Sequence, residues 1–306
     1  DDLSDENPIK RISAAKQLGI YFDTKALPYL IESLKDSDER VVEQAIYSLG
    51  VFGQEETVEP LMNCLNYDSE IVKLAAIKVL GEMQTSAVVP SLGKMLKDGN
   101  PKIRLAAAKA LGQIGDKRGM FFLIDAINDP VIDVAHTITL SLSQIKDKET
   151  IPALISVLEH HSMEVRYVAA LALGKFKDER IIKPLVNMMS DTNPKLRTAA
   201  LLGLKQMGDN QVAVNTFIKA LDDEDVYVKQ TAAFNLAELK NPKTAEFFID
   251  KLRTGDNIRI RVTAARALGS MRIINAVPVF IDLLKDEDDQ LVAECISALT
   301  EIKDPA

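Results

Sequence analysis

Tryptophan is absent from this 306-residue sequence, and aromatic residues make up only 5% of it. There are two cysteines, Cys64 and Cys295, which excludes a scaffold held together by several disulfides. Because these cysteines lie in distant segments, they favour a reducing, cytoplasmic compartment. No apolar run reaches the roughly 18 residues of a membrane helix, and no signal-peptide pattern opens the chain. We therefore expect no membrane association.

The motifs of metal, nucleotide and nucleophilic chemistry are also missing. The three histidines, His136, His160 and His161, belong to no His-Glu-x-x-His motif, and no Cys-x-x-Cys occurs. The glycines stand singly and form no phosphate-binding loop. The formal net charge of −8 argues against nucleic-acid binding. We expect no enzyme activity, metal, cofactor, nucleic-acid partner or small-molecule ligand, and we interpret both cysteines as small buried hydrophobes.

What the sequence does contain is a repeat of 31 or 32 residues, marked by a leucine that ends motifs such as KQLG, YSLG and KVLG. We call this residue the marker leucine. The marker leucines are Leu18, Leu49, Leu80, Leu111, Leu142, Leu173, Leu204, Leu236, Leu268 and Leu299. A small residue usually stands four positions before the marker, a base seven positions before it, and a glycine directly after it.

Each repeat predicts two helices. In the segment 103–112, Ile103, Ala107 and Leu111 fall on one helical face. Asn-Pro steps such as Asn100-Pro101 suit a helix start. We interpret the glycine after the marker leucine as a helix stop, since glycine tolerates the left-handed conformation. The second helix of the repeat carries Pro near its start, as at Pro28 and Pro152.

A helix pair of this size cannot bury its apolar face alone, so successive pairs must stack. The predicted fold is all-α, a right-handed α-solenoid of about ten two-helix repeats that forms a single domain over residues 1–306. The chain starts at Asp1 rather than Met, and the last repeat stops at EIKDPA without a second helix. We therefore expect either a piece of a longer protein or an end that another domain or partner covers.

The pattern NPKIRLAAAKALGQIGDKRG at 100–119 and MEVRYVAALALGKFKDERIIKPL at 163–185 resembles the short HEAT-like repeats, the type named after the phycobilisome bilin lyases. The resemblance covers the whole chain and implies the fold. In this family the base at the helix start commonly bonds to an Asp in the turn between repeats. The resemblance therefore implies a structural ladder, which we assign to Arg104, Arg166, Arg197, Arg261, Asp98, Asp129 and Asp191.

The same resemblance leaves several functions open, because such repeats serve scaffolds, chaperones, lyase subunits and regulatory modules. The similar deoxyhypusine hydroxylases bind iron through His-Glu pairs, and this chain has no His-Glu dipeptide. HEAT-like DNA glycosylases need a basic groove, whereas the second-helix row of this chain is mixed and slightly acidic. Importin-like grooves use Trp, which is absent.

Apolar residues in the second helices carry the binding hypothesis. We place these helices on the concave side and expect aromatic and Met side chains there to contact a partner. The candidate partner-binding residues are Tyr29, Phe122, Phe247, Met95 and Met188. Acidic turns between repeats and basic turns within repeats would add two charged edges. The fifth repeat departs from the pattern, with Ala135 in place of the base.

These observations favour a non-enzymatic scaffold that binds a protein or peptide partner through its concave surface and charged edges. Two alternatives stay open. A bilin-lyase-like subunit or tetrapyrrole-handling chaperone rests on the resemblance alone. A regulatory repeat module of a larger multidomain protein follows from the missing Met and the incomplete last repeat.

Overall fold

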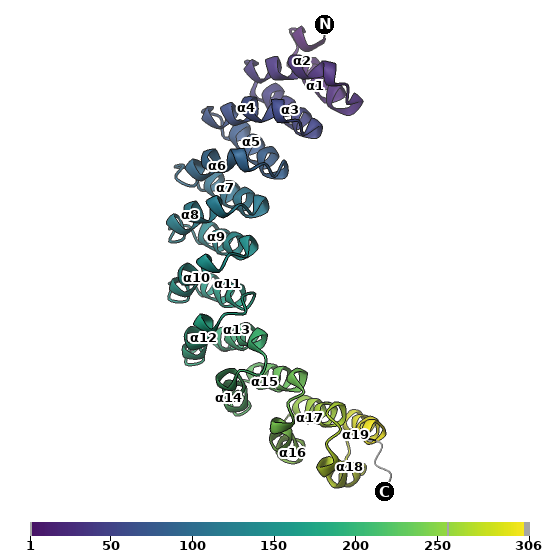
Figure 1. The fold of residues 1–306 in the computed structure, drawn as a ribbon. Helices are drawn as coiled ribbons and strands as arrows, with labels where there is room; N and C mark the ends of the chain where they lie inside the picture. Colours follow the sequence, from purple (N-terminus) through teal and green to yellow (C-terminus); the bar gives the residue numbers. More distant parts are fainter. Residues whose placement is uncertain (1, 256, 303–306) are drawn as a thin grey trace. The chain divides into compact units, whose positions relative to one another are not determined.

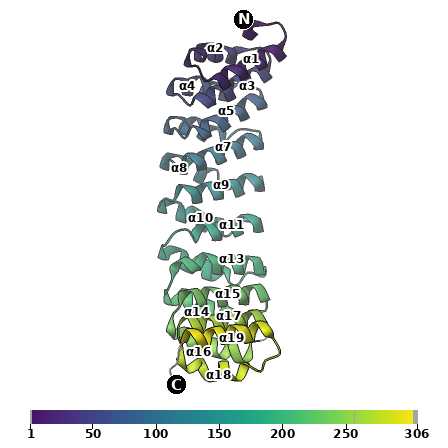
Figure 2. The ribbon, with the colours of Figure 1, turned by 90° about the vertical axis from the view of Figure 1, so that its right-hand side faces the viewer.

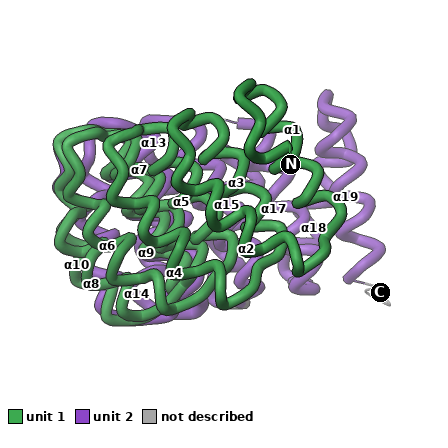
Figure 3. Tube along the Cα trace, turned by 90° about the horizontal axis from the view of Figure 1, so that it is seen from above, with its two compact units in different colours: residues 1–157 green, residues 158–306 purple. Residues whose placement is uncertain are grey.

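The computed structural model of the chain describes residues 2–255 and 257–302, and these residues form helices and turns without any strand. The all-α solenoid prediction is confirmed. Residues 303–306, where the sequence predicts the last repeat to stop, lie outside the described residues. The chain divides into two compact units, Asp1–Val157 (unit 1) and Leu158–Ala306 (unit 2), which Figure 3 colours separately.

Each unit has two layers of helices (Figure 1). The first helix of every repeat belongs to the odd layer. Its members are α1 (Pro8–Tyr21), α3 (Glu39–Phe52), α5 (Glu70–Glu82), α7 (Pro101–Ile114), α9 (Ile132–Ile145), α11 (Met163–Leu173), α13 (Pro194–Leu204), α15 (Val226–Leu239), α17 (Ile258–Ser270) and α19 (Asp289–Ile302). Within each unit, every odd helix packs against the next one along the chain.

The second helix of every repeat belongs to the even layer, and several of these helices follow a short 3₁₀ turn. Its members are α2 (Leu27–Glu32), α4 (Glu55–Asn63), α6 (Val89–Met95), α8 (Lys117–Asp125), α10 (Ile151–Val157), α12 (Ile182–Met188), α14 (Gln211–Ala220), α16 (Ala245–Thr254) and α18 (Val277–Leu283). Pro28, Pro90 and Pro278 occupy the first turn of their helices, where no backbone N–H is needed.

The helix starts agree with the sequence. Asn100 is extended, and its side-chain oxygen accepts the N–H of Lys102. Asn7 and Asn193 cap α1 and α13 in the same way, each followed by Pro at the first helical position. These side chains satisfy N–H groups that an isolated helix start leaves without a partner.

The marker leucines form the centre of each unit. Leu49, Leu80 and Leu111 are fully buried in unit 1, and Leu173, Leu204 and Leu236 are fully buried in unit 2. Leu18 and Leu299, in the first and last odd helices, are half-buried. The leucine that defines the repeat in the sequence therefore defines the core of the fold.

In five of its six occurrences the glycine after the marker leucine does not stop the helix, so the prediction is wrong there. Gly174 does directly follow the last residue of α11, but in the right-handed conformation and not the left-handed one that the prediction assumed. Gly50, Gly81 and Gly112 lie inside α3, α5 and α7. Each faces the next odd helix so closely that an added Cβ would lie 2.6–2.8 Å from a side-chain atom there. The left-handed residues stand later in the chain, as at Gly53 and Gly115. The glycine is needed for close packing of helices, not for chain reversal.

Within each unit, the odd helices lie on the inner side of that unit's curve and the even helices on its outer side (Figure 1). Figure 2 looks onto the odd helices, which within unit 1 are stacked one above another. The expectation that the second helices border the concave side is therefore wrong. Hydrophobic spacing identifies the buried face of each helix, but it does not say which layer a curved stack turns inward.

We predict that Gly174→Ala destabilises unit 2. The new Cβ would lie 2.7 Å from the Cα of Gly203 on α13, and backbone cannot move aside as a flexible side chain does. We expect overpacking to lower the free energy of unfolding by about 1–3 kcal/mol, although alanine favours helix. The measurement is thermal unfolding followed by circular dichroism. Gly99→Ala is the control, because no atom lies within 4 Å of the added Cβ; equal melting temperatures for both variants would contradict the packing role.

Candidate protein-binding surface

A ladder of charged side chains connects the turns between repeats. The Arg104 guanidinium donates two hydrogen bonds to Asp129, from Nε at 2.7 Å and from Nη2 at 3.0 Å. Its Nη1 donates to the backbone oxygen of Asp98, in the turn before α7, at 2.9 Å. The Arg104 and Asp129 side chains are only 12% and 6% exposed. One arginine thus fixes its own turn and joins it to the next.

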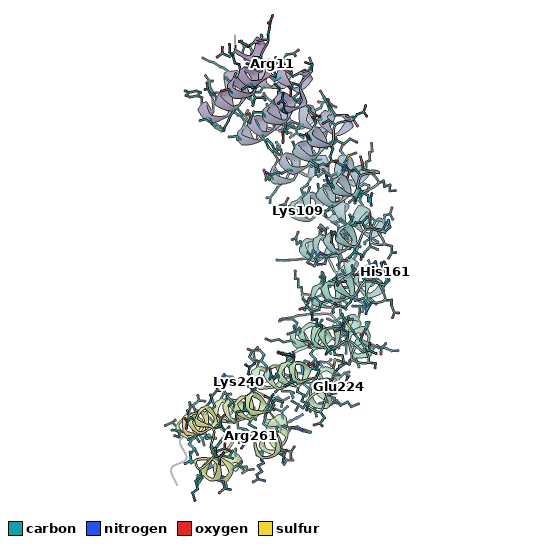
Figure 4. All side chains as sticks on the ribbon, turned by 180° about the vertical axis from the view of Figure 1, so that it is seen from behind. Arg11, Lys109, His161, Glu224, Lys240 and Arg261 are labelled. Atoms are coloured by element: carbon teal, nitrogen blue, oxygen red, sulfur yellow. The ribbon has the colours of Figure 1, made fainter. Side chains whose placement is uncertain are left out.

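The same arrangement recurs in both units, and Figure 4 labels Arg11 and Arg261 within it. In unit 1 the further pairs are Arg11–Asp36 at 2.7 Å and Lys73–Asp98 at 3.0 Å. In unit 2 the pairs are Arg197–Asp223 at 2.8 Å, Arg261–Asp286 at 2.8 Å and the longer Arg166–Asp191 at 3.5 Å.

The ladder carboxylates also accept a backbone hydrogen bond directly before the next odd helix begins. Asp129 accepts the N–H of Val131, as Asp98 accepts that of Asn100. Burial alone would raise the pKa of Asp129, but the hydrogen bonds from Arg104 and Val131 outweigh it and hold the pKa below its ordinary value. These carboxylates therefore stay ionised and serve the fold.

The second and fifth repeats lack the ladder base, and the position that would hold the partner acid carries another residue in both cases. Val42 stands in the base position of the second repeat, and the matching acid position holds Tyr67, whose hydroxyl donates to the carbonyl of Leu34. Ala135 stands in the base position of the fifth repeat, and the matching position holds His160. The His160 Nδ1 accepts the N–H of Ser162, as the Asp carboxylate does elsewhere.

The odd layer of unit 1 carries a hollow of about 440 Å³ across α3, α5 and α7. Its floor is apolar and includes Tyr47, Leu74, Leu105 and Ala106. A second hollow lies between α1 and α3, and Tyr47 lines both. The exposed side chains of Ile20 and Val51 border this second hollow. We call the solvent-facing side of α1, α3, α5 and α7 the inner face of unit 1.

Charges of both signs surround Tyr47. The Lys78 ammonium lies 5.2 Å from the centre of the Tyr47 ring, within the range of a cation–π interaction. Burial raises the pKa of Tyr47, and Glu43 and Glu82 raise it further. Lys109 lines the other end of the hollow, and Figure 4 shows it on the odd-helix side of unit 1.

The candidate residues from the sequence do not form one exposed row. Tyr29 is 66% exposed on α2, and Phe247 is 43% exposed on α16. Met95 is half-buried, and Met188 is buried. Phe122 is half-buried because its ring covers Gly93, whereas its neighbour Phe121 is 55% exposed.

Sequence reasoning missed the inner-face residues. Lys16, Tyr47, Lys78 and Lys109 all stand two positions before a marker leucine, on four successive odd helices of unit 1. In unit 2 the same position holds Leu171, Leu202, Phe234, Arg266 and Ser297. Phe234 is 49% exposed, with the Lys205 ammonium 4.9 Å from its ring centre. The 31-residue spacing of this column was the available signal.

Both cysteine thiols are buried and poorly suited to nucleophilic chemistry. Burial raises the pKa of Cys64 and of Cys295 to about 11, so both are protonated at neutral pH. The His160 and His161 rings lie 4.1 Å apart, and burial lowers the pKa of His160.

Among residues 2–255 and 257–302, no group of three or more His, Cys, Asp or Glu side chains is arranged to hold a metal ion.

In the same described ranges, none of the helices combines the length and the apolar character that crossing a bilayer requires.

The pattern of HEAT repeats matches residues 2–75, 58–134, 120–205, 182–257 and 214–300. These overlapping segments cover nearly the whole sequence, so the chain belongs to the HEAT-repeat family. No curated protein matches it.

Solved structures share the fold at low sequence identity. An engineered protein is 20% identical with a TM-score of 0.53, and the match covers 99% of this chain and 97% of that one. YibA from Escherichia coli is also 20% identical, with a TM-score of 0.55 and coverage of 88% and 98%. The complex of CpcE and CpcF of phycocyanin lyase from Nostoc sp. PCC7120 is 17% identical, with a TM-score of 0.43 and coverage of 90% and 94%.

We predict that Arg104→Ala lowers the free energy of unfolding by about 2–3 kcal/mol, because it leaves the buried Asp129 carboxylate without its guanidinium partner. Urea unfolding followed by circular dichroism measures the loss. The control is Arg118→Ala: Arg118 is 58% exposed and pairs with Asp116 two residues away, so we expect a change below about 1 kcal/mol. Equal losses in the two variants would rule out a special role for the ladder.

The depressed pKa of Asp129 also predicts a dependence on pH. Because the unfolded chain binds this proton more readily, the stabilisation is complete above the ordinary Asp pKa of 3.8 and is lost as the pH falls through the lower folded-state value. The stability gap between the wild type and Arg104→Ala should therefore shrink below about pH 4. Melting temperatures measured across acidic pH test this, and a constant gap would contradict it.

Proposed function

We propose that this chain is a non-enzymatic scaffold that binds a protein or peptide partner through the inner face of unit 1. The observation that carries the proposal is the hollow across α3, α5 and α7, whose floor includes the half-buried apolar side chains of Leu74 and Leu105. Half-buried apolar side chains around an aromatic ring are the kind of surface on which interface hot spots form.

The regular ladder supports this role. It fixes the turns before α3, α7 and α9, and the Tyr67 hydroxyl bonds the turn before α5 to the carbonyl of Leu34, so the side chains of the inner face have defined places before any partner arrives. A surface ordered in advance loses less conformational entropy on binding than a mobile one. Extended surfaces built from stacked repeats are the usual binding sites of solenoid proteins.

We predict that the double variant Tyr47→Ala/Ile71→Ser binds its partner at least about tenfold more weakly than the wild type does. Both side chains line the hollow, and Ile71 is already 40% exposed, so the change removes contact area with little effect on the core. The measurement is affinity capture from a lysate of the source cells, followed by mass spectrometry and then by titration with the purified partner.

The matched control is Tyr29→Ala/Phe247→Ala, which removes two exposed aromatic side chains of the even layer. Circular dichroism of both variants checks that the helices are intact. The proposal requires loss of the partner with the inner-face variant and retention with the even-layer variant. The reverse pattern would assign binding to the even layer, and capture of no protein by the wild type would end the proposal.

A further inference from the structure

We propose that the inner face of unit 1 binds an extended segment of a partner protein in which carboxylates recur at every third residue and apolar side chains lie between them. The carboxylates would meet Lys78 and Lys109, and the apolar side chains would cover Leu74 and Leu105. This inference rests on the proposed function and adds the chemistry of the partner.

The first argument is the placement of the lysines. Lys16, Lys78 and Lys109 occupy one repeat position on α1, α5 and α7. All three side chains are exposed, and among the described residues no carboxylate lies within ion-pair distance of them. Elsewhere in unit 1, Lys73 lies 3.0 Å from Asp98 and Lys102 lies 2.8 Å from Glu70.

This contrast matters because the chain as a whole is acidic, with a formal net charge of −8. Cations that form no ion pair within the molecule are available to carboxylates of a partner, and charge complementarity of this kind sets the register and the rate of association. The lysine column therefore favours an acidic partner over a basic one.

The second argument is the apolar floor between the lysines. Leu74 and Leu105 are half-buried on α5 and α7, and Ala106 and the exposed Ile71 adjoin them in the same hollow. A purely acidic segment would leave this floor in water. Apolar side chains in the partner would bury it, so the hollow selects segments that combine both kinds of residue.

The third argument is spacing. Packed helices lie about 8–10 Å apart, and Lys78 and Lys109 stand at equivalent positions on neighbouring helices that pack together. A polyproline II segment advances about 3.1 Å per residue with three residues per turn. Every third side chain then lies on one face, at about 9 Å intervals. This repeat matches the helix spacing, whereas carboxylates on adjacent residues would point to different sides.

The acidic side chains of the hollow, Glu43 and Glu82, limit which partner residue can face Tyr47. Glu43 and Glu82 act on the Tyr47 hydroxyl and raise its pKa, after burial, the larger cause. A carboxylate placed against Tyr47 would meet these like charges. The required carboxylates are therefore the two that meet Lys78 and Lys109, and the next partner residue in this register, which faces Tyr47, is best uncharged. An aromatic or proline ring there would stack on the exposed part of the Tyr47 side chain.

The test uses a fluorescent peptide of four Glu-Pro-Val triplets, whose prolines favour the extended conformation. Fluorescence anisotropy with the full chain should show saturable binding that weakens severalfold between about 50 mM and about 500 mM salt. A peptide of Lys-Pro-Val triplets and one of Glu-Pro-Ser triplets should each bind at least about tenfold more weakly.

The variant Lys109→Glu should weaken binding of the acidic peptide by about tenfold or more. Lys94→Glu is the matched control, since Lys94 is exposed on α6 in the even layer and the charge change is identical. Lys109→Gln, a milder change, covers the case in which the charge reversal alters folding. We expect Lys94→Glu to leave the affinity unchanged.

Tighter binding of the basic peptide, equal effects of Lys109→Glu and Lys94→Glu, or no binding of any peptide would overturn the proposed chemistry. The scaffold proposal is judged separately. If partner capture still depends on Tyr47 and Ile71 while the acidic peptide fails to bind, the scaffold role stands and only the acidic chemistry is wrong. If capture fails as well, both proposals fall.

Discussion

In the repeats that carry an arginine at the base position, a single side chain connects two turns: the guanidinium of Arg104 is bonded to its own turn and to the carboxylate of the next. The partner carboxylate in turn accepts an N–H at the next helix start. Both groups are largely withdrawn from water, so each needs the other, and loss of either leaves a buried charge. Because Arg104 near the start of α7 must reach Asp129 in the turn before α9, this pair constrains the distance between the two helix starts.

The close packing of the odd helices depends on that spacing. Gly81 faces Ala110, and Gly112 faces Ser141, at distances that leave no room for another carbon atom. The Ser48 hydroxyl, beside Gly19, donates to the backbone oxygen of Ala15 across the same contact at 2.8 Å. Small residues on both sides of each contact bring the odd helices close together. Side chains at equivalent positions therefore recur at helix spacing along the inner face of unit 1.

The sequence alone was sufficient for the repeat, the helix pairs and the asparagine caps, because each follows from local spacing and local hydrogen bonding. It did not reveal the purpose of the glycines. Gly50 looks like a stop when α3 is considered alone, and its role becomes clear only when Val79 of the next repeat is placed against it. Phe121 and Phe122 differ in exposure because one step along a helix turns a side chain by about 100°.

The inner face was missed for a related reason. The column through Tyr47 and Lys78 was visible as a 31-residue spacing, but spacing does not distinguish a layer that faces inward from one that faces outward. That distinction depends on which layer packs more closely, and the repeated glycine after the marker leucine lies in the odd layer. The ladder and the glycines thus help to determine where the inner-face side chains of unit 1 stand. The residues at this repeat position vary along the chain, with Lys16, Tyr47, Lys78 and Lys109 on four successive odd helices. The residues that hold this repeat protein together are therefore distinct from those of the face at which we propose that a partner binds.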